Sequence, residues 1–186
     1  RLQRGYAEPH RTYHNAAHIA DCLSQFDGAR HLAERPDEIE AAIWFHDAVY
    51  DPKPSDNEEQ SAILAVESLN PEVDPEALRR IAAMILATKH DREPIGADES
   101  LLIDVDLSIL GRPSKEFAVY DAAIRQEYSW VPEDRYRDGR AAVLERFLNR
   151  DAIYRTAFFR EQYEEQARRN LILAIATLRE GPMSAP

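Results

Sequence analysis

The sequence predicts an all-α fold, a single-domain helical bundle over residues 1–180. Three observations favour it. Apolar residues recur at helical spacing almost throughout, no sustained strand-type alternation occurs, and 186 residues suit one domain better than two. The 44% of hydrophobic and 31% of charged residues are those of an ordinary globular protein. Residues 181–186 are expected to form a flexible C-terminal tail.

The first half of the chain contains four helical segments. We expect helices over residues 15–33, 36–51, 56–69 and 75–90. Pro36 suits the first turn of a helix, because its missing N–H has no partner there in any case. Ser55 and Glu58 have the spacing of a capping box. Asp74 followed by Pro75 combines a helix cap with a proline at the first helical position.

The second half begins with a loop and continues with helices. Residues 91–98 read as a loop, and residues 101–110 as a short apolar helix or turn that Gly111 and Pro113 stop. Amphipathic helices then follow over residues 114–128, 132–148 and 160–178, with a short packed segment at 153–159.

Charge and cysteine content narrow the functions that are open to the chain. With 23 basic and 34 acidic residues, the net charge of −11 argues against duplex nucleic acid as a partner. A small anionic substrate stays possible if a bound cation reverses the field locally. Cys22 is the only cysteine, so an intramolecular disulfide and a zinc-thiolate cluster are excluded, and a cytoplasmic location is expected. No apolar run approaches the length of a membrane span, so we expect no membrane partner.

A polar pair stands inside an apolar run. His46 and Asp47 lie within the stretch Trp44–Asp51, among large apolar side chains. Burying such groups costs several kcal/mol, roughly, unless something pairs with them. A divalent cation is one such partner, and a structural network of hydrogen bonds or salt bridges is the other interpretation.

Further ligand types lie elsewhere in the chain. His14 and His18 are four residues apart and so share a face, as two metal-binding histidines on one helix must. Asn15 follows the first of them, where the zinc-protease helix needs glutamate. Asp104 and Asp106 are embedded in another apolar run. Imidazole and carboxylate ligands suit Mg, Mn, Fe, Co and Zn ions.

These residues resemble a known family, the HD superfamily of metal-dependent phosphohydrolases, and more narrowly a predicted-hydrolase branch of it. The resemblance spans roughly the whole chain. It is carried by four segments in the right order: Tyr13–Asn15, Trp44–Asp47, Asp56–Glu58 and Asp104–Leu107.

The resemblance implies a set of metal ligands. His14, His46, Asp47 and Asp106 match the ligands of one divalent ion, and Asp104 is the less favoured choice for the last carboxylate. In many relatives a histidine that helps to hold a second metal precedes the glutamate of the third helix. Asn57 stands at that position here, which argues against a second ion.

The resemblance also implies hydrolysis of a phosphate ester or nucleotide by a metal-activated water. Glu58 or Asp51 is the expected catalytic carboxylate, although Glu58 has a rival role in the capping box and Asp51 could simply end a helix.

The expected substrate-binding residues are Arg11, His18, Lys89 and His90, of which the arginine is suited to bidentate phosphate contact. His18 could equally be a packed helix residue, and His90 could instead stabilise the C-terminal end of its helix through the helix dipole.

Two other functions stay open from the sequence. Histidine and carboxylate ligands also hold iron, so an iron-dependent oxygenase on a related helical fold is one alternative. A non-catalytic module that keeps the ion and binds a ligand or partner is the other. A homo-oligomer is possible, because exposed helix faces and dimer surfaces have similar sequences.

Overall fold

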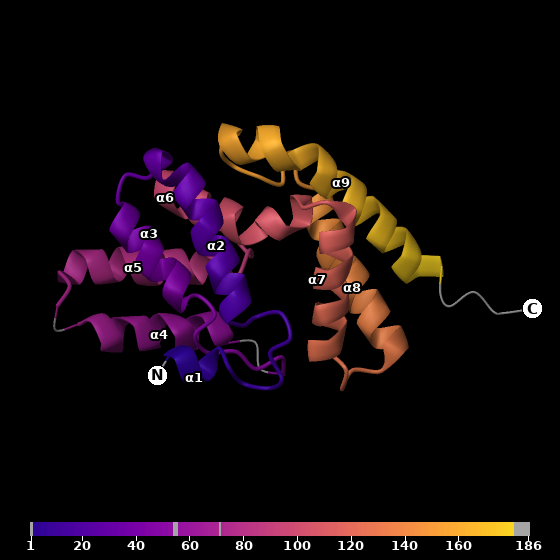
Figure 1. Ribbon diagram of the computed structural model, residues 1–186, viewed down its shortest axis with the longest axis horizontal. Coiled ribbons are helices and arrows are strands. Elements are labelled where there is room, and N and C mark those ends of the chain that lie inside the picture. The colour runs from indigo at the N-terminus through magenta and orange to yellow at the C-terminus, as the bar shows by residue number, and fades with distance from the viewer. Residues whose placement is uncertain (1, 54–55, 71, 181–186) are drawn as a thin grey trace, which may run out of the picture. The chain divides into compact units, whose positions relative to one another are not determined.

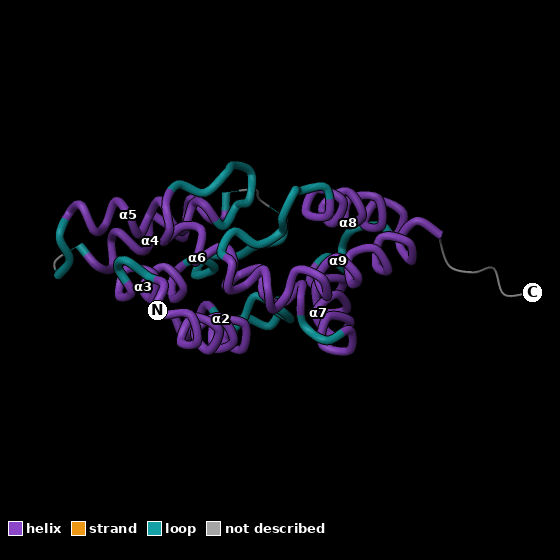
Figure 2. The backbone as a smooth tube through the Cα atoms, turned by 90° about the horizontal axis from the view of Figure 1, so that it is seen from above, coloured by secondary structure: helices purple, strands orange, loops and turns teal. Residues whose placement is uncertain are grey.

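The computed structural model describes residues 2–53, 56–70 and 72–180. Within these ranges it contains nine α-helices, two short 3-10 helices named η1 and η2, and no strand (Figure 1 and Figure 2). The predicted all-α fold class is therefore confirmed. No helix in this part of the chain is long and apolar enough to cross a bilayer.

The chain divides into two compact units, Arg1–Asp106 and Leu107–Pro186. The single domain expected over residues 1–180 stays a prediction. The tail expected at residues 181–186 lies outside the described residues, as does Ser55 of the expected capping box.

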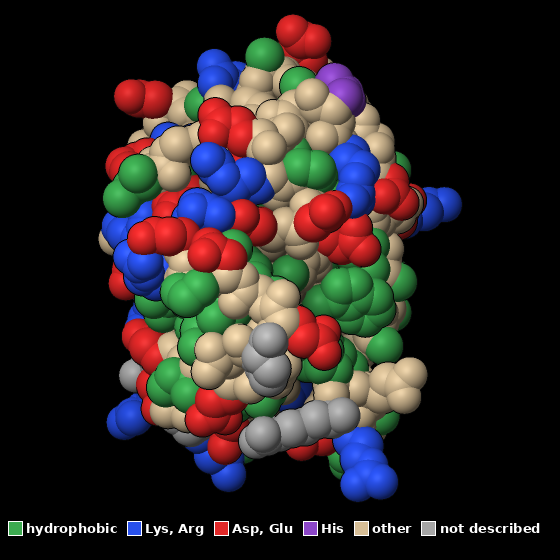
Figure 3. All heavy atoms as spheres, turned by 90° about the vertical axis from the view of Figure 1, so that its left-hand side faces the viewer, with side chains coloured by type: hydrophobic (Ala, Val, Ile, Leu, Met, Phe, Trp, Pro, Cys, Tyr) green, Lys and Arg blue, Asp and Glu red, His purple; other side chains and the backbone are tan. Residues whose placement is uncertain are grey.

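The first unit contains six α-helices and η1. Their bounds are α1 Leu2–Gly5, α2 Ala16–Ala29, η1 Arg30–Leu32, α3 Pro36–Phe45, α4 Asn57–Leu69, α5 Pro75–Ala87 and α6 Gly96–Asp106. Helix α5 packs against α3, α4 and α6, and α2 packs against α3 and α6 (Figure 1). The face drawn in Figure 3 carries acidic and basic side chains interspersed with one another.

Helix starts in this unit follow the capping residues in the sequence. The Asp74 side chain accepts hydrogen bonds from the backbone N–H groups of Glu76 and Ala77, at 3.0 and 3.1 Å. It therefore binds two of the N–H groups that a helix start leaves without a partner. Asp98 on α6 accepts from the N–H groups of Glu34 and Arg35, at 2.8 and 3.1 Å, just before α3 begins.

Some predicted bounds differ from the structure. Helix α3 ends at Phe45 rather than near residue 51, so His46 and Asp47 lie in the turn that follows it. Helix α6 begins at Gly96, whose φ of 83° is accessible to glycine but costly for other residues, and not at residue 101. The short α1 was not predicted. Trp44, the first residue of the apolar stretch around His46 and Asp47, is 42% exposed.

The second unit contains η2 Leu107–Gly111, α7 Ser114–Glu127, α8 Glu133–Leu148 and α9 Ala157–Glu180. The three predicted C-terminal helices are thus confirmed, with small changes at their ends. Asn170 on α9 is buried, and its amide donates to the carbonyls of Leu110 and Arg112, both at 2.8 Å. Its amide oxygen accepts from Ser114 at 3.1 Å. This buried amide joins α9 to the chain between η2 and α7 through paired polar groups.

Gly111 is a position where a larger residue should destabilise the second unit. A Cβ at this position would lie 2.5 Å from Cβ of Tyr163 and 2.8 Å from its carbonyl oxygen. Because backbone would have to move, we expect Gly111→Ala to lower the free energy of unfolding by about 1–3 kcal/mol.

Gly139 in α8 is the matched control, because a Cβ there meets nothing within 4 Å. Gly139→Ala should be neutral or stabilise the protein by up to about 1 kcal/mol through helix propensity. Urea unfolding followed by circular dichroism measures both variants. Equal stability of the two variants would contradict this packing argument.

Candidate metal centre

His18 lies in the first turn of α2 and is buried. The Asn15 side chain caps this helix by accepting from the Ala17 N–H at 2.8 Å. The Asn15 amide also donates to the carbonyls of Arg11 and Thr12, at 3.2 and 3.1 Å, which ties the preceding loop to the helix start. The cap thus sets where the helix begins and, with it, the position of His18.

His46 follows the last residue of α3 and is almost fully buried. Its Nδ1 lies 2.9 Å from the Ile43 carbonyl oxygen. A carbonyl can only accept, so Nδ1 carries the proton and Nε2 keeps the lone pair when the ring is neutral. Metal-binding histidines use the same arrangement to fix the tautomer and orientation of the ring.

The turn that carries Asp47 is held from two sides. The buried Arg11 guanidinium donates to the carbonyl oxygens of Asp47 and Ala48, at 2.6 and 3.2 Å. On the other side the Ser61 hydroxyl accepts from the Val49 N–H at 3.0 Å and donates to the Val49 carbonyl at 3.2 Å. The backbone of this turn is therefore bound by side chains from the loop before α2 and from α4.

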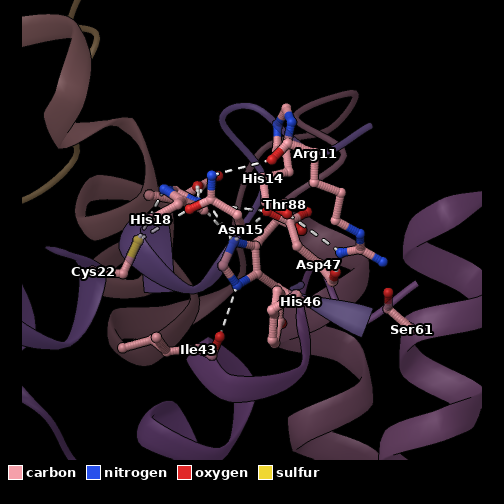
Figure 4. Close-up of polar contacts among 12 residues, drawn as sticks. Arg11, His14, Asn15, His18, Cys22, Ile43, His46, Asp47, Ser61 and Thr88 are labelled. Atoms are coloured by element: carbon pink, nitrogen blue, oxygen red, sulfur yellow. Dashed lines mark hydrogen bonds and ion pairs between the residues drawn. The ribbon is translucent and has the colours of Figure 1, made fainter. Parts of the chain in front are cut away.

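Four polar side chains from three segments meet in the first unit (Figure 4 draws three of them with labels). His18 Nε2 lies 3.2 Å from His46 Nε2, 3.4 Å from Asp47 Oδ2 and 3.3 Å from Asp106 Oδ1. His46 Nε2 lies 3.1 Å from Asp47 Oδ2 and 3.6 Å from Asp106 Oδ1. We call His18, His46, Asp47 and Asp106 the central cluster.

The central cluster is strongly coupled electrostatically. Burial lowers the pKa of His46, but the charges of Asp47 and Asp106 outweigh burial and raise it well above its ordinary value. Burial alone would raise the pKa of both aspartates, whereas the imidazoles around them lower it. The opposite shifts of the imidazole and the carboxylates thus have one cause, their close approach in a buried site. A divalent cation held there would take the place of the imidazole proton, since metal ligands must be deprotonated.

The donors of the central cluster fit a divalent ion. A tetrahedral ion with nitrogen and oxygen ligands at about 2.0–2.2 Å separates those ligands by about 3.4 Å. The five separations given above lie between 3.1 and 3.6 Å. Two imidazoles and two carboxylates also match the ligand types of Zn, Fe, Co and Mn sites. The residues present are thus able to hold such an ion.

His14, the ligand implied by the family resemblance, lies beside the central cluster. The group of donor atoms that lie within 4.8 Å of one another contains His18, Cys22, His46 and Asp106. It contains neither His14 nor Asp47, although Asp47 Oδ2 lies 3.1 Å from His46 Nε2 and 3.4 Å from His18 Nε2. The His14 ring instead stacks on Tyr50, with centroids 4.2 Å apart, and is 6.0 Å from the His18 ring. The reason is local: α2 begins at Ala16, so the helical spacing assumed for His14 and His18 does not apply.

Two further polar residues considered from the sequence, His90 and Asp104, differ in their relation to Asp106. His90 Nε2 lies 3.1 Å from Asp106 Oδ2, while Oδ1 of the same carboxylate faces His18. His90 therefore orients a potential ligand, and it does so with a φ of 56°, a left-handed conformation that is costly for this residue type. Asp104 is buried on α6, outside the cluster of potential ligands.

The other expected substrate-binding residues have protein partners in this structure. Besides its bonds to the carbonyls of Asp47 and Ala48, Arg11 donates from Nε to the Glu8 carboxylate at 2.9 Å. Lys89 Nζ lies 2.5 Å from Glu59 Oε1, which raises the pKa of the lysine. Phosphate contact by either residue stays a prediction.

The two candidate catalytic carboxylates differ in environment. Glu58 is partly buried in the first turn of α4, and burial together with the charge of Asp47 raises its pKa. Asp51 is exposed, and its carboxylate accepts from the Lys53 N–H at 3.0 Å. The backbone of Asp51 also exchanges two hydrogen bonds with the Asn57 amide. Of the two carboxylates, Glu58 is therefore the one whose pKa is raised by the charge of Asp47 in the central cluster.

Cys22 was missed as a site residue by the sequence reasoning, which excluded only a cluster of thiolates. It is buried on α2, and its Sγ lies 3.7 Å from both ring nitrogens of His18. The spacing of four residues between His18 and Cys22 was the available signal, because such residues share a helix face.

The fold and the site define an all-helical protein with a buried group of histidine, cysteine and aspartate that can hold a metal ion. Comparisons with protein-family models, curated proteins and solved structures give no match to this chain. Membership of the HD superfamily therefore stays a prediction from the four sequence segments.

Proposed function

We propose that this protein is a metal-dependent phosphohydrolase that acts on a small phosphate ester or nucleotide. The observation that carries the proposal is the convergence of His18, His46, Asp47 and Asp106 at separations suited to one divalent ion. A divalent cation held there would supply a bound water of lowered pKa and would polarise a phosphoryl oxygen.

Glu58 is the residue that we assign to proton transfer. A carboxylate with a raised pKa accepts a proton more readily near neutral pH than an ordinary one. Burial and the neighbouring charge of Asp47 provide that shift here. Glu58 would take the proton of the attacking water and pass it on to the leaving alcohol.

His14 is the residue that we assign to the substrate. Its ring is oriented by stacking on Tyr50, and its charge acts on the Asp47 carboxylate. From this position the imidazole would donate a hydrogen bond to a phosphoryl oxygen. Arg11 contributes indirectly, by holding the backbone of the turn that carries Asp47.

A substrate screen tests the proposed reaction. Protein stripped with a chelator and reloaded with Mg, Mn, Co or Zn is assayed on a panel of phosphate esters and nucleotides. We expect phosphate release that chelation abolishes and a divalent ion restores. Inactivity of the metal-loaded protein across the panel would favour the non-catalytic module. Stoichiometric iron with oxygen consumption would favour the oxygenase.

Glu58→Gln tests the assignment of the base. Removing a general base typically lowers kcat by about 10²–10⁴-fold, so we expect a loss of this size with the metal content unchanged. Glu67 is exposed on the same helix, and Glu67→Gln is the matched control with unchanged kcat. Full activity of the Glu58 variant would remove this residue from the mechanism.

A further inference from the structure

The buried thiol of Cys22 lies one helical turn after His18 and borders the central cluster. Cys22 is 2% exposed, and its Sγ approaches the His18 ring at 3.7 Å (Figure 4). A buried cysteine usually packs as a small apolar residue. Cys22 differs, because its Sγ lies within 4.8 Å of donor atoms from His18, His46 and Asp106.

The position of Sγ fits coordination of the same ion. Zinc holds sulfur at about 2.3 Å and histidine nitrogen at about 2.0–2.1 Å, so tetrahedral angles place these two atoms about 3.6 Å apart. The observed distance from Sγ to His18 Nε2 is 3.7 Å. The nitrogen and oxygen atoms of His18, His46 and Asp106 show matching separations of 3.2 to 3.6 Å.

We propose that Cys22 Sγ, in place of the Asp47 carboxylate, is the fourth protein ligand beside His18, His46 and Asp106, and that it makes the centre selective for zinc-like ions over magnesium. The proposal rests on the metal site of the proposed function. As the metal–sulfur bond forms, the thiol gives its proton to solvent and binds as a thiolate. Thiolate is a soft ligand that favours ions such as Zn²⁺ and Co²⁺, whereas Mg²⁺ requires oxygen ligands.

Cobalt provides the direct test, because Co²⁺ takes zinc-type sites and has an absorption spectrum. The metal-free protein is titrated with Co²⁺ alone. We expect visible bands from the bound ion together with an intense near-ultraviolet band from thiolate-to-cobalt charge transfer. Since Cys22 is the only cysteine in the chain, the charge-transfer band has a single possible source at one ion per chain.

Cys22→Ser separates the ligand role from packing. The variant should keep the visible bands and lose the near-ultraviolet band. Its affinity for Zn²⁺ should fall by at least about tenfold. Losing a group that only orients a metal ligand already costs about 10–100-fold, so losing a ligand should cost no less. The affinity of the variant for Mg²⁺ should not change. Cys22→Ala serves as a second variant, and circular dichroism of the metal-free proteins checks that each is folded.

The outcomes distinguish this proposal from the proposed function. Visible bands without charge transfer in the wild-type protein would overturn the role of Cys22 and leave the metal site standing. Unchanged Zn²⁺ affinity in both folded cysteine variants would overturn it as well. A wild-type protein that binds no Co²⁺ or Zn²⁺ would overturn both proposals together.

Discussion

Replacing His18 with alanine is expected to abolish tight metal binding, the largest effect that we predict. Its Nε2 is the atom that lies within 3.4 Å of donors from His46, Asp47 and Asp106 alike. Losing a group that merely orients a ligand costs about 10–100-fold in metal affinity, so removing His18 should cost more than about 100-fold. Equilibrium dialysis with Zn²⁺, followed by metal analysis, measures the change.

His14→Ala is the matched control, because the His14 ring is 6.0 Å from the His18 ring and His14 is not in the group of donor atoms within 4.8 Å of one another. We expect this variant to keep a full equivalent of metal and to bind substrate less tightly. The opposite pattern, with metal lost in His14→Ala and kept in His18→Ala, would return the ligand role to His14, as the family resemblance implies.

Arg11→Met should cause the second largest effect. It leaves the metal ligands in place and lowers the free energy of unfolding. The buried guanidinium donates to carbonyls of Asp47 and Ala48 and lies over the rings of Tyr6 and Tyr50. Methionine keeps much of the apolar length but leaves these carbonyls without donors, at about 1–3 kcal/mol for each buried group. We expect the free energy of unfolding to fall by about 3 kcal/mol and metal affinity to fall with it.

Arg79→Met is the control for this prediction. Arg79 is exposed on α5 and pairs with Glu76 on the surface, where such a pair contributes between 0 and about 1 kcal/mol. Chemical denaturation of the metal-free proteins compares the two variants. If Arg11→Met is no less stable than Arg79→Met, the turn does not depend on the guanidinium.

Much of the fold followed from local signals in the sequence. Asp74 with Pro75 marks a real helix start, and Pro36 begins α3 as expected. The end of α3 could not be placed in this way, because the apolar residues continue to Tyr50 while the chain turns after Phe45. That turn depends on Arg11 and Ser61, which are distant in the sequence.

The site was partly predictable for the same reason. His46, Asp47 and Asp106 are anomalous polar residues in apolar surroundings, and the structure brings all three together. The shared helix face expected for His14 and His18 is wrong, because the cap at Asn15 starts α2 after residue 14. The ligand role of His14, which comes from the family resemblance, stays a prediction. Cys22 lies four residues after His18 and so shares its helix face, but its nearness to His46 and Asp106 depends on contacts across helices.

The central claim is that one divalent ion binds between α2, the turn after α3 and the end of α6. Anomalous diffraction from crystals grown with Zn²⁺ tests it most directly. We predict one anomalous peak in this centre, about 2.0–2.2 Å from Nε2 of His18 and His46 and from a carboxylate oxygen of Asp106. A peak elsewhere in the chain, or none in crystals that contain zinc, would contradict the claim.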